Sequence, residues 1–244
     1  MSKLTVVILS ISLTFLLSGA FLQRHALACE LLPVLNYRQI HQHVFLQADI
    51  TRGQVEGISE LITAASARIG LVYGTPLSTP RFLLISDSQT AEKWGANATA
   101  SMHRLPWRSC IVIGPNGQNV DVIAHEWLHA EIQQRVGFFR FLIEIPVWFD
   151  EGAALTVDYR PPFLPHNIAL SAAQVQRVKL LERGSDFFSG DIRTHYQAAR
   201  LAVEPLIIKD RFFDDLQRIS LGERFDSVFV FNQAIKPGTE VSGE

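Results

Sequence analysis

Apolar residues along the chain recur at two spacings, which predict helices and short buried strands. Across 54–70 they fall every three or four positions, the spacing that places them on one face of an α-helix. Two short apolar runs at 82–85 and 110–113 have the length of buried strands, and a Gly-Pro-Asn-Gly turn follows the second. A short helix capped by a Ser-Asp-Ser segment is expected over 86–95, and a loop over 96–108.

The second half of the chain predicts helices almost throughout. Helical spacing covers 119–135 and resumes over 138–159, where Pro146 interrupts it. After a Pro-rich break, four further helices are expected, at 171–183, 191–209, 211–219 and 224–235. A small sheet early in the chain and helices later place the protein in the α+β class.

The apolar run at 4–22 differs from these segments because no polar positions mark a solvent face along most of it. It follows Lys3, and a basic residue before an apolar stretch is the arrangement of a secretion signal. Small residues at 18–20 and at 26–28 offer two places where a signal peptidase could cut. The run is also long enough to cross a bilayer, so it could instead remain as a membrane anchor.

Cys29, directly after the second of these places, gives a faint likeness to a lipoprotein attachment site. We expect 1–28 to be a signal peptide or an N-terminal membrane anchor. The domain at 29–235 would then lie in the periplasm or extracellular space, or be held at the membrane through 4–22. The last residues, 236–244, are expected to be a flexible tail.

Composition narrows the function classes. Hydrophobic residues make up 48% of the 244 residues, which is enough for a proper core, and 19% are charged, which excludes an intrinsically disordered chain. A net charge of −2 gives no indication of the basic surface that nucleic-acid binding requires. Two cysteines exclude a disulfide-dense scaffold and a cysteine-based zinc ribbon, but Cys29 and Cys110 could pair in an oxidising compartment.

The segment His125-Glu126-x-x-His129 lies within the helix expected over 119–135. Residues four apart on a helix are rotated by about 400°, so the two imidazoles share one face, one turn apart. Two histidine nitrogens so placed can reach one zinc ion at about 2.0–2.1 Å. Glu126 is about 100° round the helix, where a base could take a proton from zinc-bound water. The alternative is an ordinary helix with two solvated histidines.

A catalytic zinc has three protein ligands and an open position for water, so a third ligand is needed. Glu151 lies twenty-two residues after His129, in a Trp-x-x-Glu-Gly-x-Ala segment that runs from Trp148 to Ala154. With both motifs, the chain over roughly 80–235 resembles the gluzincins of the peptidase MA clan. The resemblance implies a zincin-like metallopeptidase domain with one zinc ion, and it implies Glu151 as the third ligand.

Other carboxylates near the motifs leave alternatives. Asp150 is a rival third ligand, although the register of the motif favours Glu151. Asp158 or Asp121 could orient a zinc-bound histidine by accepting a hydrogen bond. The Gly-x-Met-Glu-Asn loop of aminopeptidases is missing from the sequence, so aminopeptidase activity is not implied.

The resemblance also implies a mechanism. Zinc polarises the scissile carbonyl, and Glu126 takes a proton from the attacking water and passes it to the leaving amine. A later helix would supply a donor to the oxyanion, and the candidates are His195 and Tyr196, with Tyr196 preferred. The alternative is that Tyr196 packs in the core and His195 is exposed. The strand at 110–113 resembles the edge strand that aligns an extended substrate, although plain core is an equal alternative.

The sequence therefore predicts an exported zinc metallopeptidase that acts on a peptide or protein substrate. One alternative is a catalytically silent binding module with the same fold, against which the intact Glu126 argues. Another is a membrane-anchored assembly factor with structural zinc. Structural zinc usually has four protein ligands, and the sequence offers no evident fourth.

Overall fold

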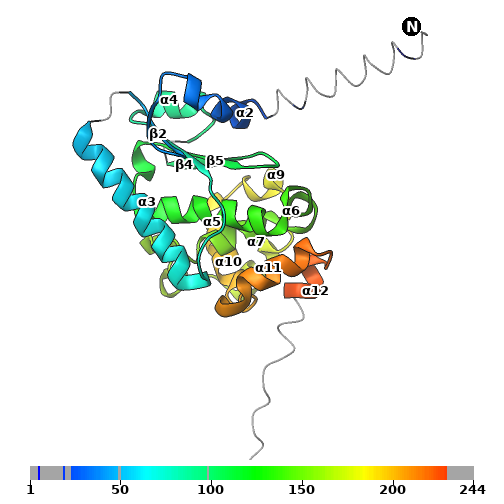
Figure 1. The fold of residues 1–244 in the computed structure, drawn as a ribbon. Helices are drawn as coiled ribbons and strands as arrows, with labels where there is room; N and C mark the ends of the chain where they lie inside the picture. The colour runs from blue at the N-terminus through cyan, green and yellow to red at the C-terminus, as the bar shows by residue number, and fades with distance from the viewer. Residues whose placement is uncertain (1–4, 6–18, 20–22, 49–50, 98, 230–244) are drawn as a thin grey trace, which may run out of the picture. The chain divides into compact units, whose positions relative to one another are not determined.

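The computed structural model describes residues 5, 19, 23–48, 51–97 and 99–229 (Figure 1). The chain divides into two compact units. Unit 1 contains Met1–Glu60 and Thr79–Asn119, and unit 2 contains Leu61–Ser78 and Val120–Glu244. Both lie mainly within the span predicted as one domain, and together they form an α+β protein.

Two sequence predictions fall wholly or largely outside the described residues. These are the apolar run at 4–22, of which only Thr5 and Gly19 are described, and the tail at 236–244. Among the residues that the structure does describe, no helix has the length and hydropathy needed to span a bilayer.

Unit 1 is built on a mixed five-stranded sheet with the order β1-β2-β3-β5-β4. The strands are β1 (Arg38–His41), β2 (Val44–Leu46), β3 (Arg81–Leu84), β4 (Ala100–Arg104) and β5 (Ser109–Ile113). The three middle strands run parallel, and the two outer strands, β1 and β4, are antiparallel to their neighbours. The predicted strands at 82–85 and 110–113 are confirmed as β3 and β5, and every residue of both is buried.

The structure corrects the prediction for the edge of this sheet. Residues 96–108 were expected to form a loop, but β4 lies within them and pairs antiparallel with β5, with Met102 opposite Ile111. The strand at 110–113 is therefore interior and not an edge strand. The reason is physical: β4 has one strand neighbour and is mostly half-buried, so it needs no continuous apolar run.

Short helices complete unit 1. They are α2 (Arg24–Glu30), η1 (Leu32–Val34), α4 (Ser88–Lys93) and η2 (Pro115–Gly117). The helix predicted over 86–95 is confirmed as α4, and the Asp87 side chain accepts a hydrogen bond from the backbone N–H of Thr90 at its start. The helix predicted over 54–70 is confirmed as α3 (Arg52–Tyr73), which belongs partly to each unit.

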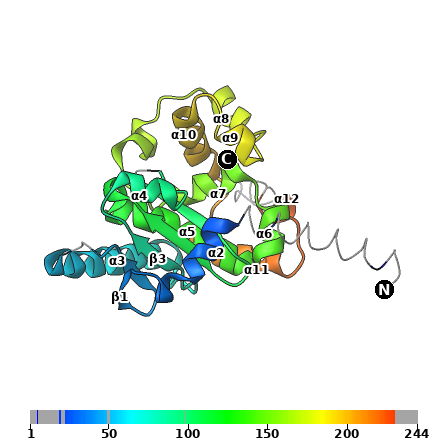
Figure 2. The ribbon, with the colours of Figure 1, turned by 90° about the horizontal axis from the view of Figure 1, so that it is seen from above.

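Unit 2 is helical. Its α-helices besides α3 are α5 (Val120–Val136), α6 (Phe138–Glu144), α7 (Val147–Ala154), α8 (Ala172–Val178), α9 (Gly184–Phe187), α10 (Ile192–Val203), α11 (Phe212–Ser220) and α12 (Phe225–Phe229). Three short 3-10 turns join them: η3 (Pro161–Phe163), η4 (Pro165–Asn167) and η5 (Lys209–Arg211). Helix α7 packs against α5 and α10, and α8 packs against α10 (Figure 2).

Several helices of unit 2 are shorter than their sequence patterns predict. The region at 138–159 divides into α6 and α7, because Pro146 is the N-cap of α7. The helix expected over 191–209 ends at Val203, and the described part of the one expected over 224–235 is α12.

An aromatic cluster holds α7 in place. The Phe149 ring is fully buried, and its centroid lies 4.4 Å from that of Phe229 and 4.8 Å from that of Phe225. Phe212 of α11 lies against the same ring, at 6.4 Å. Burial of large aromatic side chains contributes strongly to stability, so this cluster fixes the helix that carries the second sequence motif.

Candidate metal centre

Helix α5 brings the two histidines of the first motif together. Both side chains are buried, and the Nε2 atoms of His125 and His129 lie 3.2 Å apart. The helix is held by its apolar side, where Ile123, Leu128 and Ile132 have no exposed surface. The prediction that one helix face presents both imidazoles is therefore confirmed, whereas the alternative of two solvated histidines is wrong.

Helix α7 adds the carboxylate of Glu151 to this pair. Its Oε2 lies 3.5 Å from His125 Nε2 and 3.4 Å from His129 Nε2. Three ligands at about 2.0–2.1 Å from a tetrahedral ion are separated from one another by about 3.3–3.4 Å. The three atoms thus form a nearly equilateral triangle whose sides fit one face of such a site. The buried group of His125, His129 and Glu151 could hold one metal ion.

Two more carboxylates face the opposite nitrogens of the imidazoles. His129 Nδ1 lies 3.0 Å from Asp150 Oδ1, and His125 Nδ1 lies 3.6 Å from Asp158 Oδ2. Such partners fix the ring orientation of a metal-binding histidine. Asp150, the rival third ligand, therefore lies behind His129, away from the Nε2 atoms.

Asp158 is itself held by Arg160. The Arg160 Nε lies 2.9 Å from each carboxylate oxygen of Asp158, and its Nη2 donates to Oδ2. Asp121, the other carboxylate considered for this role, instead binds Arg68 and the backbone N–H of Tyr159. The structure thus brings Asp158, and not Asp121, to His125.

Electrostatics at the centre favour a cation. With neutral imidazoles, the group carries the negative charges of Asp150, Glu151 and Asp158 against the positive charge of Arg160. Burial alone would lower the pKa of His129, but the charges of Asp150 and Glu151 outweigh it and raise that pKa well above its usual value. Burial likewise works against the Glu151 carboxylate, yet the two histidines hold its pKa well below its usual range.

The Oε2 atom of Glu151 is consistent with a bound ion. It is buried, and among the described residues it makes no hydrogen bond of normal geometry. Buried polar atoms in native proteins nearly always have a partner, and an ion is one explanation of an exception. The donor set of two imidazoles and one carboxylate suits zinc.

Glu126 lies beside the group and not in it. The residue is only partly buried, and its negative charge acts on His125 and on Arg160. It also acts on Tyr196, a residue of a different helix. Glu126 therefore lies close to the candidate metal centre without belonging to its ligand triangle.

Helix α10 brings Tyr196 to the same place. Its ring centroid lies 6.4 Å from that of His125, and its hydroxyl interacts with the Glu151 carboxylate. Burial, and then the charges of Glu151 and Glu126, raise the pKa of Tyr196 far above its usual value, so the hydroxyl keeps its proton. The ring of His195 instead lies at the Phe187 carbonyl, with Nδ1 2.7 Å from that oxygen.

Gly152 sets the separation of α7 and α10. A Cβ atom at this position would overlap the carbonyl oxygen of Ala199 and would lie 2.6 Å from Val203 Cγ1. Only glycine permits this close approach. Since Gly152 follows Glu151 and Ala199 is one turn beyond Tyr196, the contact fixes the position of Tyr196 relative to Glu151.

Sequence reasoning missed Arg160 and the role of Asp150. Arg160 lies in the segment interpreted as a Pro-rich break, where no periodicity shows which side chains meet. Its position two residues after Asp158 was the one signal in the sequence. Asp150 was considered only as a ligand. Adjacent helical residues point about 100° apart, so Asp150 and Glu151 cannot both face the same ion from one helix.

The comparisons with known proteins add no further assignment. No model of a known protein family matches the chain, and a search of curated proteins gives no significant match.

Proposed function

We propose that this protein is an exported zinc metallopeptidase of the gluzincin type, with a zincin-like fold. The single observation that supports this most is the triangle of His125 Nε2, His129 Nε2 and Glu151 Oε2, with Glu126 beside it. Three protein ligands leave a fourth position for water, which is the arrangement of catalytic and not of structural zinc.

The protein's own residues would divide the work as follows. A bound zinc supplies Lewis-acid chemistry, because it lowers the pKa of water and polarises a carbonyl. Glu126 accepts the proton of the attacking water and returns it to the nitrogen of the leaving amine. Tyr196 donates its O–H to the carbonyl oxygen as negative charge develops there.

The surrounding carboxylates support this assignment of roles. Asp150 and Asp158 lie 3.0 and 3.6 Å from the Nδ1 atoms of His129 and His125, where they could orient the imidazoles with Nε2 toward a metal ion. Arg160 keeps Asp158 in position through its paired hydrogen bonds. The neutral hydroxyl of Tyr196 is a donor at working pH, as an oxyanion partner must be.

Export is supported by the bond between the two cysteines. Cys29 and Cys110 form a disulfide, and such bonds persist mainly in oxidising compartments. The apolar run at 4–22 after Lys3 supports the same location.

The proposal is tested with the full chain, purified, loaded with zinc and mixed with a fluorogenic peptide library. We expect cleavage that a zinc chelator stops and its non-chelating isomer does not. Glu126→Gln should bind zinc and cleave about 10²–10⁴-fold more slowly, whereas the matched control Glu92→Gln, at an exposed position on α4, should cleave normally. A zinc-loaded chain that cleaves no peptide would contradict the proposal and favour a silent binding module.

A further inference from the structure

Helix α2 is a folded part of unit 1, although all but its last two residues lie within the segment predicted as a leader. Ala26 is 1% exposed and Cys29 is fully buried. Leu32, just after the helix, is also fully buried, and Ala28 packs against the same core. The helix thus contributes buried side chains to the core of unit 1.

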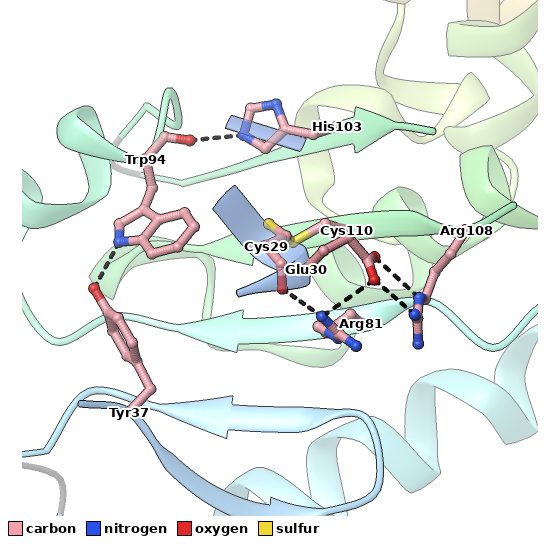
Figure 3. Close-up of a disulfide and its surroundings, with 8 residues drawn as sticks. All are labelled: Cys29, Glu30, Tyr37, Arg81, Trp94, His103, Arg108 and Cys110. Atoms are coloured by element: carbon pink, nitrogen blue, oxygen red, sulfur yellow. Dashed lines mark hydrogen bonds and ion pairs between the residues drawn. A yellow bond between two sulfur atoms is a disulfide. The ribbon is translucent and has the colours of Figure 1, made fainter. Parts of the chain in front are cut away.

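A covalent bond joins α2 to the sheet (Figure 3). The Sγ atoms of Cys29 and Cys110 form a disulfide across a sequence separation of 81 residues. Cys110 lies on β5, an interior strand with all of its residues buried. A sulfur in a disulfide has no free valence, so Cys29 cannot also carry a thioether-linked lipid.

Charged groups bind the C-terminal end of α2 (Figure 3). Glu30 accepts hydrogen bonds from Arg108 Nε and Nη2, at 3.2 and 2.8 Å, and lies 3.6 Å from Arg81 Nη1. Arg81 is buried and also donates to the carbonyl oxygen of Cys29. A cut after Ala28 would place a new ammonium group on the fully buried Cys29, beside this arginine, which is unfavourable.

The N-terminal end of α2 is in close contact with the rest of unit 1. The His25 ring lies against Gly95, which has a φ of +70°, and a Cβ there would come 2.6 Å from His25 Cε1. The same ring lies 5.4 Å from the ring of His103, which in turn contacts the Trp94 carbonyl at 2.7 Å. Removal of His25 would remove these contacts with Gly95 and His103.

We infer that α2 belongs to the mature exported domain, so the leader ends upstream of Arg24. The chain would then be cut near 18–20 or would keep the run at 4–22 as an anchor, and neither cleavage at 26–28 nor lipidation of Cys29 occurs. The inference rests on the export part of the proposed function and not on the metal centre. Closing the disulfide transfers two electrons and two protons from the thiols to a disulfide-exchange oxidant of the outer compartment.

The test is the N-terminus of the full chain made in a host that exports proteins to an oxidising compartment. Cells are lysed in a thiol-alkylating reagent, and intact mass and N-terminal peptides are measured in every fraction. We expect the first residue at or before Arg24 and both cysteines alkylated only after reduction. A chain starting between His25 and Cys29, a lipid on Cys29, or two free thiols would overturn the inference.

A matched pair of variants separates the disulfide from lipidation. Cys29→Ser and Cys110→Ser both break the disulfide, but only the first removes a lipid-attachment residue. We expect the same N-terminus and the same membrane partition for both variants as for the wild type, which mass spectrometry reads even from unfolded protein. A shift in Cys29→Ser alone would overturn the inference. Peptide hydrolysis is not a readout here, so failure of this test is distinct from failure of the proposed activity.

Discussion

Gly152→Ala is a sharp test of how α7 and α10 position the candidate centre. The added Cβ would overlap the Ala199 carbonyl oxygen and lie 2.6 Å from Val203 Cγ1. Because a backbone carbonyl cannot turn away, α10 must move by about 1 Å to restore van der Waals contact. We therefore expect Tyr196, which α10 carries, to move away from Glu151.

The magnitude follows from the overlap. Overpacking a core costs about 1–3 kcal/mol, and for a protein of this size each kcal/mol lowers the melting temperature by about 2–4 °C. Gly152→Ala should therefore melt about 2–12 °C below the wild type. A misplacement of about 1 Å can reduce turnover by about 10²-fold, so peptide hydrolysis should fall far more than zinc content.

The assays are thermal denaturation followed by circular dichroism, metal analysis, and peptide hydrolysis on the same preparations. Gly57→Ala on α3 is the matched control, because no atom lies within 4 Å of its added Cβ. That control should be neutral or slightly stabilising. A Gly152→Ala protein with the melting temperature and hydrolysis of the wild type would refute the close-contact argument.

Three further predictions concern the carboxylate behind His129, the proposed base and a helix cap. Asp150→Asn should weaken zinc affinity about 10–100-fold in a competition assay with a chromophoric chelator, and complete loss of zinc would instead make it a ligand. Glu126→Gln should keep zinc and lower the rate of peptide hydrolysis by about 10²–10⁴-fold, and release of zinc would be contrary to its role as base. Hydrogen bonds lower the pKa of the Asp87 carboxyl, and the one from the Thr90 backbone N–H contributes most. The carboxylate therefore stabilises the protein at pH values above the usual pKa of aspartate, and this stabilisation is lost as the pH falls through the lowered pKa. Asp87→Ala should thus lower the melting temperature more at pH 7 than at pH 2, and an equal loss at both would contradict this.

The sequence predicted the parts of the centre that depend on local periodicity. His125 and His129 share a helix face because residues four apart on a helix do. The helix α5 itself could be predicted from the spacing of its apolar residues. The resemblance carried by the second motif implied Glu151 as a third ligand, and the position of Glu151 beside the histidines depends on the packing of α7 on α5. Only the shared face of the two histidines is set within one helix.

Features that depend on pairing between distant segments were missed or left open. Strand β4 takes its conformation from β5, and its own residues carry no strand pattern. The role of Asp150 depends on which side of His129 it meets, which the packing of α7 on α5 decides. The place of α2 in unit 1 is another case, because α2 is held by residues of β5 and by Arg81 and Arg108, far along the chain.

Zinc content tests the central claim most directly. Metal analysis of the purified full chain should find about one zinc ion per chain, and His129→Ala should lose most of it. His166→Ala is the matched control, since His166 is exposed and lies on η4, and it should keep the full amount. Stoichiometric zinc in His129→Ala, or its loss in both variants alike, would contradict the assignment of His125, His129 and Glu151 as the metal ligands.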